Sequence, residues 1–339
     1  MVADAGSATS WVLVSGTGPV RVYALDLATG ALVPKGLADA GLNPSFLAVD
    51  PARRNVYAVN EGGVNSTVTA LSFNSKTGAL TPLNSTVVGS GPAHLAVDPT
   101  GAWVLAANYN GGSVVAVPVR PSGGVGAVKT TVQPGSQPHQ VVIDSSTHSA
   151  FVPCKGSDSV AQYRFEPDGG SLTPLAPPTI STASGAGPRH LALHPSGAWA
   201  YLVNEVDSTL TSLSITNGRL TPIETHSTLP VGFSGPNTGA EVLVHPSGKW
   251  VYASNRGHDS IVQFQVDQAT GTLDLVGHTT TLGQSPRCFT IDPTGRVMLV
   301  ANQNSSTVKT FFLDAGTPVS TGHDIAVDSP AYVGVILSE

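Results

Sequence analysis

The segment PAHLAVDPTG at residues 92–101 decides the fold, because close copies of it recur along the whole chain. Most copies contain a proline, a short apolar run and then an Asp-Pro or His-Pro turn. The seven copies begin at Pro44, Pro92, Pro138, Pro188, Gly239, Pro286 and Pro330. Successive starts lie between 44 and 51 residues apart, and a steady period of this length is typical of repeat architectures.

The sequence after each of the first six copies predicts three more strands. A second apolar run ends near an asparagine, as in WAYLVN at 199–204, and a third run alternates, as in DSIVQFQVD at 259–267. A turn such as TGTL at 270–273 then leads to a fourth run. Runs of period two between Gly, Asp and Pro turns indicate consecutive hairpins. Four strands in a unit of this size form the blade of a β-propeller.

The two ends of the chain complete each other. WVLVSG at 11–16 and VRVYALD at 20–26 match the second and third strands of a blade, whereas AYVGVIL at 331–337 matches a first strand. A blade shared by both ends would close the ring without an open edge. We therefore predict an all-β, seven-bladed β-propeller with four antiparallel strands per blade, formed by residues 1–339 as a single domain.

Composition narrows the classes of partner. Only 11% of the residues are charged, the net charge is −6 and no run of basic residues occurs. A surface that binds nucleic acid or anionic lipid needs clustered Lys and Arg side chains, so neither partner is expected. No stretch approaches the about 18 apolar residues that a membrane-spanning helix requires.

The two cysteines and the first residues give weaker indications. Cys154 and Cys288 lie far apart and outside any CxxC spacing, so we expect free thiols and neither a disulfide nor a metal site. The start MVADAGSATS has no basic segment followed by an apolar one. We expect a cytoplasmic protein; the alternative is a periplasmic or secreted protein in its mature form, with its signal peptide removed.

Two sets of repeat-equivalent positions are expected to form rings near one rim of the central channel, which the first strand of each blade lines. The positions after the repeated proline hold Ser45, Ala93 with His94, His139, Arg189 with His190, Glu241, Arg287 and Ala331. The positions after the second run hold Glu61, Tyr109, Lys155, Glu205, Arg256 and Gln303. The framework is constant while these positions vary in chemistry, as expected of a binding surface carried by a scaffold.

Cationic groups outnumber carboxylates at these positions, although the whole chain is acidic. Such a rim suits a small anionic ligand, because arginine presents paired donors to a carboxylate or phosphate. The alternative is structural: the charges could pair only with one another to close the axis. Purely structural roles are expected for His194 and His245 in turns, for Trp103, Trp199 and Trp250 in packing, and for Cys154.

Three long segments resemble a known family. They are GAGPRHLALHPSGAWAYLVNE at 185–205, LPVGFSGPNTGAEVLVHPSGKWVYASNRGHDS at 229–260 and SPRCFTIDPTGRVMLVANQNSSTV at 285–308. The chain resembles the lactonase family of seven-bladed propellers, which includes bacterial 6-phosphogluconolactonases and fungal carboxy-muconate cyclases. Two departures from the family pattern lie in the third copy, where Gln137 replaces the first histidine of a His-Ala-His motif and Cys154 replaces an aspartate.

The resemblance implies an active site. The catalytic His, Arg, Glu and Arg of the cyclase branch fall on His139, Arg189, Glu205 and Arg256. The remaining rim residues are predicted to bind substrate: His94, Lys155, His190, Glu241, Arg287 and Gln303. Neither a metal nor a cofactor is predicted, and the expected partner is a small anionic lactone or carboxylate, bound by a monomer or a dimer.

The leading hypothesis is metal-independent hydrolysis of a sugar-derived or other anionic lactone. Arg256 and Arg287 would hold the substrate's anionic group, Arg189 would stabilise the oxyanion, and His139 or Glu205 would act as general base. No nucleophilic serine is needed, in agreement with the absence of a G-x-S-x-G motif. Two alternatives remain open: lactonisation of a muconate-type diacid at the same site, and a non-catalytic binding module.

Overall fold

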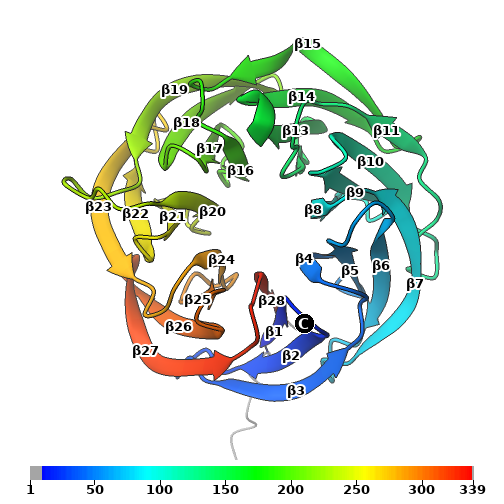
Figure 1. Cartoon of the computed structure of the whole chain (residues 1–339), viewed down its shortest axis with the longest axis horizontal. Helices are drawn as coiled ribbons and strands as arrows, with labels where there is room; N and C mark the ends of the chain where they lie inside the picture. The colour runs from blue at the N-terminus through cyan, green and yellow to red at the C-terminus, as the bar shows by residue number, and fades with distance from the viewer. Residues whose placement is uncertain (1–9, 338–339) are drawn as a thin grey trace, which may run out of the picture.

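The computed structural model describes residues 10–337, which form seven four-stranded antiparallel sheets arranged in a ring around a central channel (Figure 1). Blade 1 contains β4 (Pro44–Val49), β5 (Asn55–Asn60), β6 (Ser66–Phe73) and β7 (Leu80–Gly89). Blade 2 contains β8 (Pro92–Val97), β9 (Trp103–Asn108), β10 (Ser113–Pro118) and β11 (Thr130–Val132). Blade 3 contains β12 (Val142–Asp144), β13 (Ser149–Cys154), β14 (Ser159–Glu166) and β15 (Ser171–Ser181).

The other blades repeat this order from the channel outward. Blade 4 contains β16 (Pro188–Leu193), β17 (Trp199–Asn204), β18 (Thr209–Thr216) and β19 (Arg219–Ser227). Blade 5 contains β20 (Thr238–Val244), β21 (Trp250–Arg256), β22 (Ser260–Val266) and β23 (Leu273–Thr280). Blade 6 contains β24 (Pro286–Ile291), β25 (Val297–Asn302), β26 (Thr307–Asp314) and β27 (Thr317–Ala326).

Blade 7 is built from both ends of the described chain, as the sequence predicts. It contains β28 (Tyr332–Leu337) on the inside, followed outward by β1 (Ser10–Ser15), β2 (Val20–Leu25) and β3 (Leu32–Ala38). β28 and β1 pair over six residues, from Ser10 with Leu337 to Ser15 with Tyr332. The predicted seven-bladed propeller, with its shared closing blade, is therefore confirmed.

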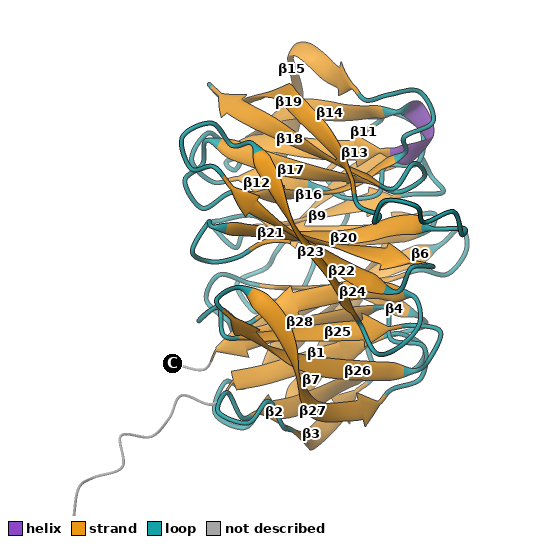
Figure 2. Cartoon of the chain, turned by 90° about the vertical axis from the view of Figure 1, so that its left-hand side faces the viewer, coloured by secondary structure: helices purple, strands orange, loops and turns teal. Residues whose placement is uncertain are grey.

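The strands run between two faces of the ring (Figure 2). The repeated proline or glycine of each copy lies at or within a few residues of the start of its inner strand, at one face that is here called the entrance face, and the Asp-Pro and His-Pro turns lie at the opposite face. A short 3-10 turn at Lys155–Ser157, purple in Figure 2, also lies at the entrance face. Both predicted rings of side chains therefore belong to the entrance face.

Bulges at the start of the inner strands direct side chains into the channel. The register between first and second strands shifts at Pro44/Phe46, Pro92/His94, Pro188/His190, Gly239/Val242 and Pro286/Cys288. Each shift leaves the residues just after the repeated proline or glycine outside the regular ladder. A bulge of this kind re-aims a side chain while the rest of the strand stays paired.

The inner strand of blade 3 is shorter than its sequence predicts. PHQVVIDS at 138–145 pairs as a strand only over Val142–Asp144, with an isolated bridge between Pro138 and Cys154. Gln140, which lies just before this short strand, reaches the next blade, where its Oε1 accepts a hydrogen bond from the Leu191 amide at 2.6 Å. Gln137 has a positive φ of 54°, which bends the chain at the position where the family histidine is missing.

Tryptophan side chains pack between neighbouring blades. The ring of Trp103 on β9 fills the space over Gly170 in the outer hairpin of blade 3, and its Nε1 donates to the Pro167 carbonyl at 2.6 Å. The same contact between a tryptophan and a glycine of the next blade recurs for Trp11 with Gly78, Trp199 with Gly271 and Trp250 with Gly316. The packing role predicted for Trp103, Trp199 and Trp250 is confirmed, Trp11 shares it, and each of these contacts crosses between two blades.

His194 and His245 also connect blades. Nδ1 of each imidazole lies 2.7 or 2.8 Å from the hydroxyl of Ser196 or Ser247 in its own turn. Nε2 lies 2.9 Å from the carbonyl oxygen of Gly248 or Gly295 in the following blade. The turn role predicted for both histidines is confirmed.

Substitution of Gly170 by alanine is expected to destabilise the ring by on the order of 2–4 kcal/mol. Gly170 has a φ of +67°, and an added Cβ would collide with the Trp103 ring; the left-handed conformation and the overpacking each carry a cost. The matched control is Gly169→Ala, where a Cβ meets no atom within 4 Å. Urea unfolding of both variants measures the difference, and equal midpoints would contradict the interpretation of the tryptophan contact.

Candidate active site

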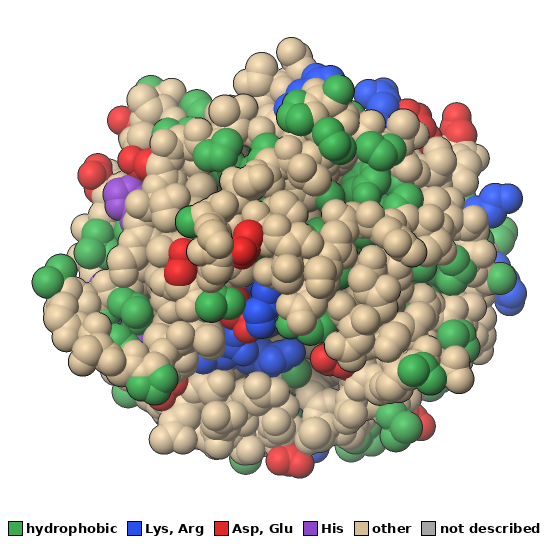
Figure 3. Space-filling model, turned by 45° about the horizontal axis from the view of Figure 1, so that its top comes forward, with side chains coloured by type: hydrophobic (Ala, Val, Ile, Leu, Met, Phe, Trp, Pro, Cys, Tyr) green, Lys and Arg blue, Asp and Glu red, His purple; other side chains and the backbone are tan. Residues whose placement is uncertain are grey.

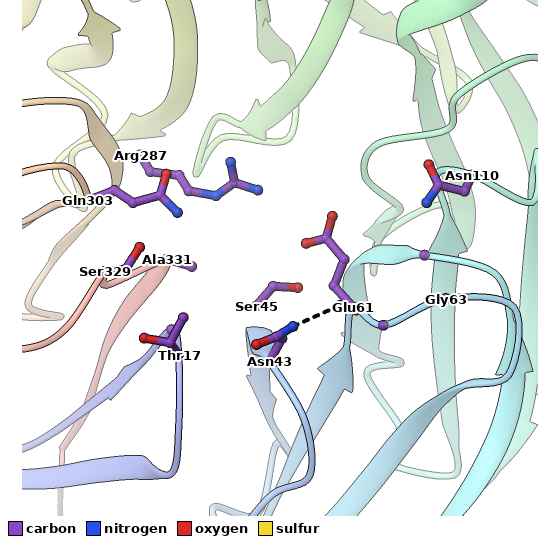
Figure 4. Close-up of a pocket in the computed structure, with 13 residues that line it drawn as sticks. Thr17, Asn43, Ser45, Glu61, Gly63, Asn110, Arg287, Gln303, Ser329 and Ala331 are labelled. Atoms are coloured by element: carbon purple, nitrogen blue, oxygen red, sulfur yellow. Dashed lines mark hydrogen bonds between the residues drawn. The ribbon is translucent and has the colours of Figure 1, made fainter.

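A cavity of about 480 Å³ opens at the entrance face over blades 1, 2, 6 and 7 and is called here the mouth (Figure 4). Amide and hydroxyl side chains supply most of its polar lining: Thr17, Asn43, Ser45, Asn110, Gln303 and Ser329. Glu61 and Arg287 point into it from opposite sides (Figure 4). Within residues 10–337 neither of these two side chains forms an ion pair.

A much narrower space lies beneath the mouth and is called here the floor. It measures about 10 Å³ and is lined by His139, Arg189, His190, Glu241 and Arg287, together with Ser45, Phe46, Ala93, Cys288 and Ala331. A cavity of about this size admits roughly one water molecule. Ser45, Arg287 and Ala331 line both spaces, so a ligand in the mouth would stand directly over the floor.

Glu205 lies among three cations. Its Oε1 accepts a hydrogen bond from Lys155 Nζ at 2.8 Å and lies 3.2 Å from Arg256 Nη2, while Oε2 lies 3.0 Å from Arg189 Nε. Lys155 and Glu205 directly follow the second strands of blades 3 and 4, Arg256 ends the second strand of blade 5, and Arg189 lies in the bulge of blade 4. Burial alone would raise the pKa of Glu205, but Arg189, Arg256 and Lys155 together lower it to about 2. Glu205 is therefore ionised throughout the neutral range.

Arg189 is held rigidly at the floor. Only 2% of the residue is exposed, and its Nη1 donates to the Ala240 carbonyl of the next blade. Burial and the neighbouring Arg256 lower the pKa of Arg189 to about 9, which leaves the guanidinium charged at neutral pH. A fixed, dry cation of this kind can stabilise an oxyanion without reorganisation.

Three buried histidines lie side by side: His139 and His190 line the floor, and His94 packs next to His190. The ring centroid of His190 lies 5.0 Å from that of His139 and 5.6 Å from that of His94, both edge to face. Phe46 packs against His94 at 4.2 Å, and Tyr109 contacts His139 at 5.6 Å. Burial, and then the nearby charges, hold the pKa of His94 and His139 well below the usual value, so both are neutral at neutral pH.

His190 alone among these histidines has a carboxylate partner. Its Nδ1 lies 2.8 Å from Glu241 Oε1, and both side chains are buried. Glu241 Oε1 also accepts the Val242 amide at 3.1 Å, and the Glu241 amide donates to Ser254 Oγ at 3.0 Å. Nε2 of His190 is buried without a hydrogen-bond partner among the described residues. The carboxylate thus fixes the ring and leaves the other nitrogen free.

The structure brings the ten predicted site residues into one region of the entrance face, in three different settings. His139, Arg189, His190, Glu241 and Arg287 line the floor, and Arg287 also lines the mouth with Gln303. Lys155, Glu205 and Arg256 line neither space and join the site through their ion pairs around Glu205. His94 lines neither space and contacts the site through the His190 ring. In Figure 3, Lys and Arg side chains gather in the central hollow.

The catalytic and substrate-binding residues predicted from the sequence omit several that shape the site. Glu61 and Ser45 occupy ring positions and reach the mouth or the floor. Thr17, Asn43, Asn110 and Ser329 come from the connecting loops at the entrance face. For these four, the sequence holds no repeat signal, because each lies one or more residues outside the two repeated positions.

The two cysteines are free and buried. Cys288 lines the floor, and burial raises its pKa strongly; burial also raises the pKa of Cys154 to about 12. Both thiols are therefore protonated at neutral pH and are poor nucleophiles. Among residues 10–337 no three His, Cys, Asp or Glu side chains are arranged to hold a metal ion. No helix of the same part of the chain is long and apolar enough to cross a membrane.

The chain belongs to the family described as lactonase, 7-bladed beta-propeller, whose model matches residues 4–335. The 6-phosphogluconolactonase of Sodalis glossinidius is 32% identical over 209 residues. That match covers 61% of this chain and 62% of the relative, so it spans about three fifths of each protein.

Two solved structures match almost the whole length. The periplasmic gluconolactonase of Pseudomonas aeruginosa aligns with a TM-score of 0.91 and 29% identity, covering 98% of this chain and all of that one. A protein from Bacteroides fragilis, provisionally assigned as a 6-phosphogluconolactonase, aligns with a TM-score of 0.92 and 28% identity, covering 98% of this chain and 99% of that one. The resemblance noted from the sequence is thereby confirmed.

Proposed function

We propose that this protein hydrolyses a lactone at the junction of mouth and floor. The observation that carries the proposal is the floor itself, where a space for one water adjoins two arginines and an oriented histidine. The lactone carbonyl would lie over the floor, so that water attacks the carbonyl carbon from below. Membership of the lactonase family and the names of the relatives support this reaction class.

The proposed steps use only groups of this chain. The water oxygen forms a bond to the carbonyl carbon while an imidazole takes its proton, and Arg189 or Arg287 stabilises the tetrahedral oxyanion. The bond from that carbon to the ring oxygen then breaks, and the departing alkoxide takes the proton back from the imidazolium. The product is an open-chain hydroxy acid, and no covalent enzyme intermediate is required.

The mouth favours a lactone that carries several hydroxyl groups. Amides and hydroxyls such as Asn43, Asn110 and Gln303 can exchange hydrogen bonds with a polyol ring, and Glu61 can accept from its hydroxyls. Arg287 can bind a carboxylate or phosphate on the same ligand. The cellular location stays a prediction: we propose the cytoplasm, and the alternative is the compartment named for the Pseudomonas relative, the periplasm.

The test is release of acid from lactones, followed with a pH indicator. Glucono-δ-lactone, its 6-phospho form and a muconolactone are offered to the protein in the presence of a chelator. We expect chelator-resistant opening of at least one polyhydroxylated lactone, well above the spontaneous rate. No turnover of any of the three by folded protein would contradict the proposal, and an open-chain muconate would then test the lactonising alternative.

A further inference from the structure

We infer that His190, oriented by Glu241, is the general base that activates the attacking water; this inference rests on the proposed lactone hydrolysis. The sequence assigned the base to His139 or Glu205 and placed His190 and Glu241 only among the binding residues. Three candidate bases therefore stand near the floor. Their hydrogen bonds and ion pairs distinguish them.

Glu205 is poorly suited to accept a proton. All three of its cationic neighbours lie within 3.2 Å of its carboxylate oxygens, and protonation would break this arrangement. It also lines neither the mouth nor the floor. Its geometry fits a different task, which is to hold Arg189 and Arg256 in place.

His139 lines the floor but lacks an orienting partner among the described residues. Its Nδ1 is buried without a hydrogen bond, and its contacts are the ring edges of Tyr109 and His190. A protonated His139 would face Arg189, Arg287 and the other two imidazoles with no carboxylate against it. The positive charge that a base acquires would therefore be uncompensated.

His190 has the complete arrangement of an activated base. Glu241 binds Nδ1 at 2.8 Å and is itself fixed by the Val242 amide. Nε2 is buried and has no partner among the described residues, and His190 lines the space for one water. A base whose second nitrogen is held by a carboxylate has one defined tautomer and a stabilised imidazolium. The proton passes from water to Nε2, and Glu241 compensates the charge across the ring.

The decisive experiment measures kcat/KM against pH for wild type, His190→Gln, Glu241→Gln and His139→Gln with the lactone that the wild type opens fastest. We expect His190→Gln to lower kcat by about 10²–10⁴-fold with little change in KM. Burial holds the pKa of His190 below its usual value, Glu241 acts in the opposite direction, and Arg189 and Arg287 lower the pKa further. Glu241→Gln should therefore move the acid limb of the profile to lower pH, besides lowering kcat. A purely structural role for Glu241 would leave the limb in place.

The matched control is His226→Gln, which removes the histidine of a His–Glu pair on the outer strand β19. His226 Nε2 lies 3.0 Å from Glu224 Oε1, with about a third of each side chain exposed, and we expect unchanged kinetics. Full activity in folded His190→Gln, or loss confined to His139→Gln, would overturn the inference while leaving lactone hydrolysis intact. If His190→Gln does not fold, the acid limb of the Glu241→Gln profile tests the inference: a limb at lower pH supports it, and a limb in the wild-type position overturns it. A wild type that opens none of the lactones would overturn both proposals.

Discussion

Replacement of Arg189 by methionine is expected to lower kcat for lactone opening by about 10²–10³-fold, the loss found when one oxyanion donor is removed. Its guanidinium lines the floor and is fixed by the Ala240 carbonyl and by Glu205. Methionine keeps much of the buried volume, so the packing at the floor is largely preserved. Initial rates at saturating substrate give the effect on kcat.

A lysine at position 189 distinguishes the contribution of positive charge to kcat from that of the planar guanidinium geometry. Arg189→Lys keeps a cation but cannot reach Ala240 and Glu205 with one planar group, so we expect a rate between those of wild type and Arg189→Met. The control is Arg164→Met, since Arg164 pairs with Glu166 on β14, the third strand of blade 3, and is more than half exposed. Undiminished turnover by folded Arg189→Met would contradict the oxyanion role.

The second large effect concerns stability in acid. Glu205 has a pKa of about 2 in the folded protein, against an ordinary value of 4.5. A lowered carboxyl pKa stabilises the fold above the unfolded pKa, and this stability is lost as the pH falls from 4.5 through about 2. The shift corresponds to on the order of 3 kcal/mol, and Glu205→Gln should remove it.

Glu205→Gln should also lower the free energy of unfolding at pH 7, because three cations would lose their shared carboxylate. Breaking such a buried cluster costs about 3–5 kcal/mol. Urea unfolding at several pH values between 2 and 7 measures both effects. The control is Glu166→Gln, whose carboxylate is about half exposed, with a change below about 1 kcal/mol. A Glu205→Gln curve that runs parallel to the wild-type curve below pH 4.5 would contradict the assignment.

The repeat made the architecture predictable. Because the first six copies carry the same apolar pattern, each predicts the same four strands, and the copy at Pro330 predicts the first strand of a blade that the start of the chain completes; the structure places them so. The two ring positions also follow from the repeat, since equivalent residues of a closed ring share one face. Blade 3 departs from its pattern because Gln140 bonds to the next blade, a contact that local sequence does not reveal.

The pairing of side chains within the site was harder to predict. Contacts of Arg189 with Ala240, His190 with Glu241 and Gln140 with Leu191 all join residues 51 positions apart. This interval is one repeat, so neighbouring copies offer a usable signal for contacts across blades. The repeat spacing predicts which residues lie next to each other in adjacent blades, but it does not predict their side-chain rotamers. The sequence therefore could not show that Glu205 pairs with three cations whereas Glu241 pairs with a histidine.

Closure of the ring by β28 has a consequence for synthesis on the ribosome. β28 pairs with β1 and packs between β24 and β4, yet it is translated after all the other described strands. Until it leaves the exit tunnel, the nascent chain carries six finished blades and one sheet whose inner edge is open. Release of β28 thus closes the ring by covering the inner edge of β1 and the sides of β24 and β4. A chain that terminates before Tyr332 would leave that strand edge exposed to pairing with other nascent chains.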